Sequence, residues 1–417
     1  MFRYKMRIKY EKKLLLMRLS LAFLVSVILF SGLSRAATVM PTAPAKVTAR
    51  CGRGALLDIS GQRVLLVAGS PYEMGYQQGK LLKPQVQAVV KLVLVVAKTA
   101  EARQSKDYLF PGGLENAFER TRKFINKRYF DEMRGLADGA DIPLKDVQLA
   151  NVFPELFHCS GFALFGKATV GGKLLHGRIL DYMTCVGLQK FAVVTVAKPN
   201  GYNSFVTAGY AGFLGSVTGM NDKQIAIGEM GGSCQGHWDG MPMSFLIRKV
   251  LEEAETLDEA VNIFRQAKRT CEYYYVISDG KIPDGVGLAC TGEKFEVIKS
   301  SDVHPQLPYA IDDAVLMSEG KRYEHLAALV KKRYGKIDVP VALELMNRPV
   351  AMKHCLHRVL FAPMELKLWV ANAADIGEEN YAACYQPYYS YNFKQLLSLI
   401  PDAAPDSAEI IANKALQ

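Results

Sequence analysis

Two short stretches of sequence form the hairpin that decides the fold. Residues 158–163 are His-Cys-Ser-Gly-Phe-Ala, and residues 176–182 are His-Gly-Arg-Ile-Leu-Asp-Tyr. Their apolar runs, separated by a glycine-rich turn, predict an antiparallel β-hairpin. In such a hairpin the end of the second strand returns beside the start of the first. We therefore expect Arg178 and Asp181 to lie near Cys159.

These three residues form a candidate site for nucleophilic catalysis. A guanidinium beside a thiol stabilises the thiolate, and a nearby carboxylate accepts hydrogen bonds from an amine or from the arginine. Cys159 would then be the nucleophile, oriented by an ion pair of Arg178 and Asp181. The spacing alone also allows a buried or disulfide-bonded Cys159 beside a local Arg178–Asp181 salt bridge.

Helices predominate before residue 159 and strands after it. Ser70 and Thr256 are each followed three residues later by Glu, which predicts two helix starts with capping boxes. Helical patterns extend over about 71–104, 114–137, 144–152, 243–268 and 321–334. Besides the hairpin, strand patterns extend over 54–59, 63–67, 191–197, 204–208, 224–227, 273–277, 294–298 and 366–371. This order predicts an α+β domain of layered sheets and helices.

Positive charge is concentrated at the N-terminus. The 417 residues include 51 Lys and Arg and 41 Asp and Glu, a formal net charge of +10. Eight of these bases and one of these acids fall within residues 1–36, so the remainder carries +3, which gives no reason to expect a nucleic-acid partner. In residues 1–36 a basic stretch precedes an apolar run and small residues. This pattern predicts a secretory signal peptide, the chain's only membrane contact, and a secreted or periplasmic protein.

Cysteine and histidine spacing predicts no metal or cofactor site. Eight cysteines in an exported protein favour disulfides, but their density is far below that of a disulfide-rich scaffold. None forms a Cys-x-x-Cys pair, so neither a zinc ribbon nor a thioredoxin-type site is indicated. The cluster at 354–357, His-Cys-Leu-His, lacks a third and fourth ligand at a usual spacing, and we expect a packed strand there.

The sequence resembles the autoproteolytic N-terminal-nucleophile hydrolases of the acyl-CoA:6-aminopenicillanic acid acyltransferase type, a group related to acid ceramidase and the choloylglycine hydrolases. Its most specific match is the hairpin, with Cys159 followed by His-Gly-Arg-x-Leu-Asp. Softer matches follow in the expected order, so the resemblance extends over nearly all of the chain after the signal. They lie at 69–79, 151–155, 219–223, 359–363 and 368–372.

This resemblance implies a precursor that cuts itself between His158 and Cys159. The products would be an α chain of 37–158, a mainly helical pro-region, and a β chain of 159–417, and the two would stay associated. The implied fold is a four-layer αββα sandwich of antiparallel sheets. The oligomeric state is not indicated.

The resemblance also implies roles for single residues. Cys159 would be the nucleophile, and its newly freed α-amine, with an ordinary pKa of about 7.7–8.0, the general base. Arg178 and Asp181 would orient the thiol and the amine. The substrate would be a linear acyl amide, whose acyl group is hydrolysed or transferred through a thioester on Cys159.

The chain departs from the family pattern at two places. The family usually has Asn within His-Gly-Arg-Asn-Leu-Asp, and this chain has Ile179. The oxyanion-stabilising asparagines of the choloylglycine relatives lack a matching residue, because Glu229 and Ser318 stand in the candidate segments. Asn221 is a candidate substitute, or else a turn residue.

Other function classes remain open from the sequence. A papain-like thiol hydrolase would use Cys159 with a distant histidine and no self-cleavage. A non-catalytic envelope binding protein would keep the fold without the chemistry. Glycoside hydrolysis by Glu229 and Asp181 has no support beyond residue type. The aromatic run 273–275 favours a buried strand over a surface that stacks bases.

Overall fold

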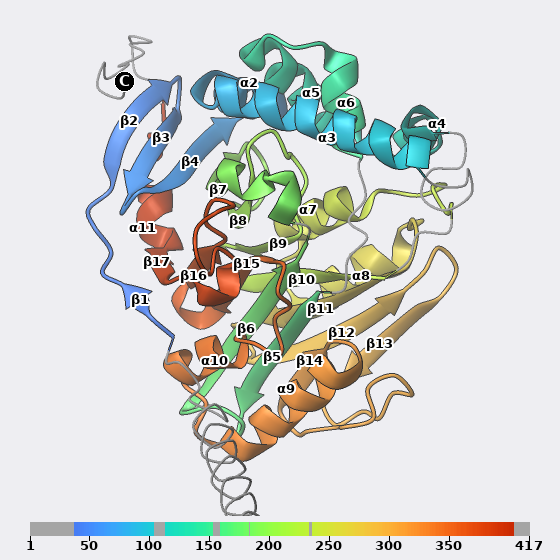
Figure 1. The fold of residues 1–417 in the computed structure, drawn as a ribbon, viewed down its shortest axis with the longest axis vertical. Coiled ribbons are helices and arrows are strands. Elements are labelled where there is room, and N and C mark those ends of the chain that lie inside the picture. The colour runs from blue at the N-terminus through green and yellow to red at the C-terminus, as the bar shows by residue number, and fades with distance from the viewer. Residues whose placement is uncertain (1–36, 104–112, 153–158, 183, 233–235, 404–417) are drawn as a thin grey trace, which may run out of the picture. The chain divides into compact units, whose positions relative to one another are not determined.

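Two β-sheets form the centre of the protein, and helices cover them (Figure 1). The computed structural model describes residues 37–103, 113–152, 159–182, 184–232 and 236–403. The predicted signal peptide at 1–36 and the cleavage residue His158 therefore lie outside the described residues.

The first sheet has seven strands and contains the predicted hairpin. Its strand order is β1-β17-β16-β15-β6-β5-β14, and neighbours run antiparallel except β1 and β17. The hairpin is confirmed as β5 and β6. The strands are β1 (Val39–Met40), β5 (Ser160–Gly166), β6 (Gly172–Asp181), β14 (Ala314–Met317), β15 (Cys355–Ala362), β16 (Lys367–Asn372) and β17 (Tyr388–Asn392).

The second sheet has ten strands. Its order is β13-β12-β11-β10-β9-β8-β7-β4-β3-β2, with one parallel pair, β4 and β7. The strands are β2 (Lys46–Cys51), β3 (Gly54–Ile59), β4 (Gln62–Gly69), β7 (Ala192–Pro199), β8 (Phe205–Tyr210), β9 (Thr218–Asn221), β10 (Ile225–Gly231), β11 (Tyr273–Asp279), β12 (Asp284–Cys290) and β13 (Phe295–Lys299).

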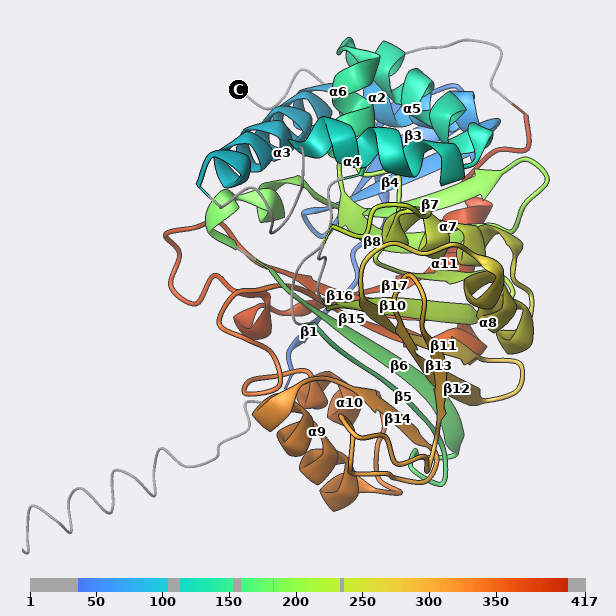
Figure 2. The same cartoon turned by 90° about the vertical axis from the view of Figure 1, so that its right-hand side faces the viewer.

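The sheets pack face to face as the two inner layers. Strand β5 contacts β11 and β12, and β6 contacts β10. Helices α7 (Met243–Glu253) and α8 (Leu257–Gln266) cover the ten-stranded sheet, and α9 (Gly320–Arg333) and α10 (Val339–Leu345) cover the seven-stranded one (Figure 2). This is the expected four-layer αββα arrangement, although the two parallel strand pairs depart from wholly antiparallel sheets.

The segment before residue 159 contributes strands as well as helices. Its strand β4 pairs with β7 of the later segment, a connection that the expectation of a mainly helical region missed. The helix expected over 71–104 is broken at Leu82, because the Lys83-Pro84 pair disfavours a continuous helix. The helices here are α2 (Pro71–Leu81), α3 (Lys83–Arg103), α4 (Gly113–Thr121), η1 (Arg122–Phe124), α5 (Lys127–Ala140) and α6 (Leu144–Ala150).

Helices α2 and α5 approach each other so closely that their glycines are required. A Cβ atom added at Gly75 would overlap the carbonyl oxygen of Glu132, and one added at Gly135 would overlap that of Tyr72. Gly79 and Gly139 repeat the arrangement one turn further along. Backbone atoms cannot move aside as a flexible side chain can, so any larger residue must push the helices apart.

Replacing Gly135 by Ala is therefore expected to destabilise the fold. Separating the helices would open the packing between α2 and α5, at a cost of about 3 kcal/mol. Thermal unfolding of Gly135→Ala should show a clear decrease in the midpoint temperature. Gly292→Ala is the matched control, because its nearest atom would be the Arg269 carbonyl oxygen at 3.5 Å. Equal midpoints for the two variants would contradict the assignment of a close helix contact.

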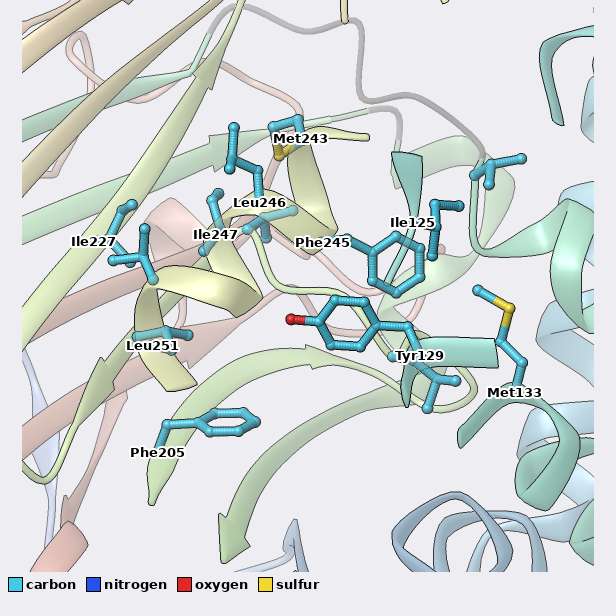
Figure 3. Close-up of a cluster of buried hydrophobic side chains, with 14 of the residues drawn as sticks. Ile125, Tyr129, Met133, Phe205, Ile227, Met243, Phe245, Leu246, Ile247 and Leu251 are labelled. Carbon is cyan, nitrogen blue, oxygen red and sulfur yellow. The ribbon is translucent and has the colours of Figure 1, made fainter. Parts of the chain in front are cut away.

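A buried apolar cluster joins α5 to α7 (Figure 3). The rings of Tyr129 and Phe245 stack with centroids 4.9 Å apart, and Met133 of α5 belongs to the same buried cluster.

The predicted helix restart at Thr256 is confirmed by a complete capping box. The remaining helices are η2 (Thr184–Val186), η3 (Leu188–Phe191), η4 (Pro363–Glu365), η5 (Ala383–Tyr385) and α11 (Phe393–Ser398). Within the described ranges, no helix is both long and apolar enough to cross a membrane.

Candidate active site

The β5–β6 hairpin brings Arg178 to the Cys159 thiol. In its register Gly161 lies opposite Arg178, so residues 159 and 178 point to the same side of the sheet. Arg178 Nη2 donates to Cys159 Sγ at 3.6 Å. Both side chains are buried, Cys159 with 3% of its surface exposed. The positive charge beside the sulfur favours a thiolate.

Arg178 is held by groups from two other strands. Its Nε donates to the Glu229 carbonyl oxygen at 3.0 Å, and its Nη2 forms a salt bridge with Glu229 Oε2, also at 3.0 Å. Its Nη1 lies 2.9 Å from His357 Nε2. Glu229 belongs to β10 and His357 to β15, so the guanidinium connects the two sheets. Removing it would leave the buried Glu229 carboxylate without this charge partner.

His357 is a neutral histidine whose tautomer follows from its neighbours. Burial and the Arg178 charge hold the pKa of His357 well below its ordinary value. Since Arg178 can only donate, His357 Nε2 must accept, and the ring proton resides on Nδ1. Nδ1 lies 3.2 Å from the Tyr210 hydroxyl, to which it can donate. A chain of contacts therefore runs from Cys159 through Arg178 and His357 to Tyr210.

Asp181 lies on the opposite face of β6 from Arg178, and its carboxylate pairs with the guanidinium of Arg322. Its Oδ2 accepts from Arg322 Nη1 at 2.6 Å, and its Oδ1 accepts from the Met352 amide at 2.9 Å. The same Arg322 atom donates to Ser160 Oγ at 3.2 Å, which shares a 2.7 Å hydrogen bond with Ser318 Oγ. Asp181 is thereby tied to the residue that follows Cys159.

The expected Arg178–Asp181 ion pair is therefore wrong. Position 181 is three residues after position 178, and side chains alternate along a strand, so these two project from opposite faces. Arg178 pairs with Glu229, and Asp181 pairs with Arg322. Burial raises the pKa of Asp181 to about 6, against the opposing effect of Arg322. The carboxyl group is thus mostly ionised at neutral pH.

Asn221 is the last residue of β9, and its side chain binds backbone groups in and around the turn that follows. Its Oδ1 accepts from the amides of Lys223 and Ile225, at 3.1 and 2.9 Å. Its Nδ2 donates to the carbonyl oxygens of Leu251 and Ala254, at 3.1 and 2.7 Å. These four bonds use the hydrogen-bonding capacity of the carboxamide, and none involves the Cys159 cluster. The arrangement agrees with a turn residue, and the oxyanion role of Asn221 stays a prediction.

An apolar cavity adjoins the cluster. It holds about 590 Å³ of space not filled by atoms, part of it open to solvent. Tyr210, which lines it, is the residue bonded to His357. Its other lining residues are mostly apolar and come from α3, α6, β6, η3, β15 and the residues just after β6 and β8. They are Val89, Val90, Val93, Ala150, Leu180, Tyr182, Leu188, Gly212, Phe213 and Leu356.

The described residues contain no group of three or more His, Cys, Asp or Glu side chains arranged to hold a metal ion. The cluster at 354–357 enters strand β15, as expected, and His357 there contacts Arg178 instead. The run 273–275 is part of β11, and Tyr273 and Tyr275 are buried.

Several residues of the cluster had no local signal in the sequence. His357, Tyr210 and Arg322 lie far from Cys159 along the chain, and only the packing of sheets and helices brings them together. Glu229 was noticed by residue type, and its role as the partner of Arg178 was missed.

The chain is similar in sequence to several known proteins. The family model for acyl-coenzyme A:6-aminopenicillanic acid acyl-transferase matches residues 171–281. Protein dcd1A of Dictyostelium discoideum is 28% identical over 320 residues, 66% of this chain and 71% of that protein. Acid ceramidase of Macaca fascicularis is 25% identical over 313 residues, 69% of this chain and 71% of that enzyme.

The chain is similar to the N-terminal-nucleophile hydrolases, through the acyl-transferase model at residues 171–281 and through acid ceramidase. The family prediction is thereby confirmed, as is the broad class of amidohydrolase or acyltransferase. Among solved structures, the N-acylethanolamine-hydrolyzing acid amidase ortholog of Caenorhabditis elegans is similar, with a TM-score of 0.40 and 16% identity. That similarity covers 56% of this chain and 99% of that chain. The cluster around Cys159 is the candidate active site of this chain.

Proposed function

We propose that this protein is an exported, self-processing cysteine amidase or acyltransferase that acts on linear amides with an apolar acyl chain. The observation that carries the proposal is the buried contact of Arg178 with Cys159 Sγ, which is connected through His357 and Tyr210 to an apolar cavity. An acyl chain suits such a cavity, since apolar walls bind it by excluding water.

Self-cleavage would begin at Cys159. Its Sγ attacks the carbonyl carbon of His158, the carbon–nitrogen bond breaks, and the Cys159 nitrogen takes up a proton to become an α-amine. Water then hydrolyses the thioester and restores the thiol. Arg178 stabilises the thiolate during the attack. In this proposal Ser160, held by Arg322 and Ser318, fixes the backbone that follows the cut bond.

Turnover would use the same sulfur on a substrate acyl carbon. The α-amine of Cys159 accepts the thiol proton and returns it to the leaving amine, so a thioester forms as the amide bond breaks. Water or an acceptor amine then takes the acyl group. Asp181 accepts a hydrogen bond from the α-amine and orients it, together with Arg322. Asn221 has no step in this proposal, because the backbone engages its carboxamide.

The two products of cleavage would stay associated through buried contacts. Arg128 Nη2 lies 2.8 Å from Glu252 Oε2, and Arg248 Nη2 lies 2.9 Å from Glu132 Oε2. Each pair joins α5 of the proposed α chain to α7 of the proposed β chain. Separating the chains would break these pairs, the Tyr129–Phe245 stack and the β4–β7 pairing, which is unfavourable in a buried site.

Two observations support export: the signal-peptide pattern of residues 1–36 and a cysteine that forms a disulfide. Cys271 is disulfide-bonded. Disulfides persist mainly in oxidising compartments outside the cytosol. Both observations support a secreted or periplasmic location, with the signal peptide as the membrane contact.

Intact mass, N-terminal sequencing and an acyl-amide assay test the proposal together. We expect one fragment to begin at Cys159, and hydrolysis of N-acyl amides to improve from acetyl to dodecanoyl. Activity in a chain that stays whole, abolished by a single His→Ala change, would favour the papain-like alternative. A whole chain without activity, with Cys159 resistant to alkylation, would favour the binding-protein alternative.

A further inference from the structure

One wall of the apolar cavity is formed by the last residue of β8 and the short loop that follows it. This wall loop, residues 210–214, contributes Tyr210, Gly212 and Phe213 to the lining. Tyr210 also bonds to His357, which contacts Arg178. Tyr210 is anchored in β8, so the position of Gly212 and Phe213 sets the shape of the cavity without moving the contact chain that leads to Cys159.

Two side chains from the segment before residue 159 hold the backbone of the wall loop. Gln78 Oε1 accepts from the Gly212 amide at 2.7 Å. Asn151 Nδ2 donates to the Gly212 carbonyl oxygen at 3.0 Å, and Asn151 Oδ1 accepts from the Leu214 amide at 2.8 Å. Both polar groups of the Gly212 backbone are thus bound by side chains that come from α2 and from the end of α6.

The contact is buried and close. Gln78 is 5% exposed and Asn151 is 1% exposed, so neither bond competes with bulk water. Gly212 has a φ of +79°, and a Cβ there would lie 3.4 Å from Val86 of α3. The wall loop therefore lies against α3, which supplies the facing cavity residues Val89, Val90 and Val93.

We propose that Gln78 and Asn151 are positioning residues that determine acyl-chain selectivity by fixing the wall loop. This inference rests on the proposed function. Neither residue touches the reacting atoms. If the chain is cut at Cys159, both residues lie on the α chain and the wall loop on the β chain. The α chain then controls which acyl groups the β chain accepts.

The test uses variants of similar shape that cannot form these bonds. Gln78→Met and Asn151→Leu leave the Gly212 and Leu214 backbone groups without their partners, so the wall loop should shift toward water. We expect the KM for a dodecanoyl amide to rise about tenfold. The KM for the acetyl amide and both kcat values should change less than about twofold, because the lost bonds hold Gly212 and Leu214, whereas Tyr210 keeps its pairing in β8 and its contact with His357.

Gln77→Met is the matched control. Gln77 is also 5% exposed and also binds a backbone, that of Ala68 in β4, at 2.9 and 2.8 Å. A general loss of stability would affect all three variants, whereas a change in chain-length preference should appear only for Gln78 and Asn151. Equal losses for the acetyl and dodecanoyl amides, or the same preference shift in Gln77→Met, would overturn the inference.

A binding measurement separates this inference from the proposed function. In a Cys159→Ala background, the affinity for a fluorescent dodecanoyl amide should fall about tenfold on Gln78→Met, while an acetyl analogue is unaffected. If the protein with Cys159 intact shows no turnover while this difference in binding is found, the proposed activity is rejected and the positioning role is retained. An unchanged dodecanoyl affinity would reject the positioning role, whatever the activity.

Discussion

Replacement of Cys159 by Ala is expected to leave a single uncut chain and to abolish amide hydrolysis. The sulfur is the proposed nucleophile of both reactions, so its removal takes the attacking atom from each of them. Loss of a nucleophile that acts together with its base typically reduces kcat by about 10⁴-fold or more. Intact mass and N-terminal sequencing report the cleavage, and release of amine from a dodecanoyl amide reports the turnover.

Cys290→Ala is the matched control for this result. Both thiols are 3% exposed and neither is disulfide-bonded. Burial raises the pKa of Cys290 to about 12, so that thiol is unreactive near neutral pH. Cys290→Ala should be cut and should turn over substrate at the wild-type rate, after correction for the fraction folded. Normal cutting of Cys159→Ala would contradict self-processing by this thiol.

The local parts of the fold could be predicted from the sequence. Turn glycines and apolar runs predicted β5 and β6, and serine or threonine with glutamate predicted the starts of α2 and α8. These signals act within a few residues, where hydrogen bonding and steric preference are decisive. The pairing of β4 with β7 brings together segments separated by more than a hundred residues, and nothing in either strand's pattern specifies its partner.

In the candidate active site, too, contacts within one hairpin could be predicted from the sequence, whereas contacts between distant strands could not. Cys159 and Arg178 belong to one hairpin, so their contact followed from its register. Glu229 and His357 come from β10 and β15, and they reach Arg178 only because the sheets pack as they do. The pairing of Arg178 with Asp181 failed on alternation along β6, a rule that the sequence alone could have supplied.

The buried charge network also explains why a catalytic arginine would be hard to replace here. Its guanidinium contacts Glu229 twice, His357 once and Cys159 once, and these four contacts require its planar fork of donors. A lysine ammonium has the charge but one nitrogen. Arg178→Lys is therefore a demanding test of whether charge or geometry matters at this site.

We expect Arg178→Lys to lose about 10³-fold in kcat/KM, and Arg178→Met to lose as much or more. Arg178→Lys has one nitrogen for four contacts, and Arg178→Met loses the donor to Cys159 altogether. Arg178→Met also leaves the Glu229 carboxylate without this cation, which should destabilise the fold by about 3–5 kcal/mol. The measurements are kcat/KM on a dodecanoyl amide, normalised to titrated thiol, and denaturant unfolding. Arg358→Lys is the control, since Arg358 is also buried in the seven-stranded sheet and bonds Asn347 and Gln386 instead.

A double variant separates the two effects of Arg178. Arg178→Met combined with Glu229→Leu removes both charges, so most of the lost stability should return, because two apolar side chains can replace a buried ion pair. Activity should stay lost, since the donor to the Cys159 sulfur is still absent. Recovery of turnover along with stability would mean that Arg178 only supports the fold. Recovery of stability without turnover would mean that the positive charge of Arg178 acts on the Cys159 thiolate.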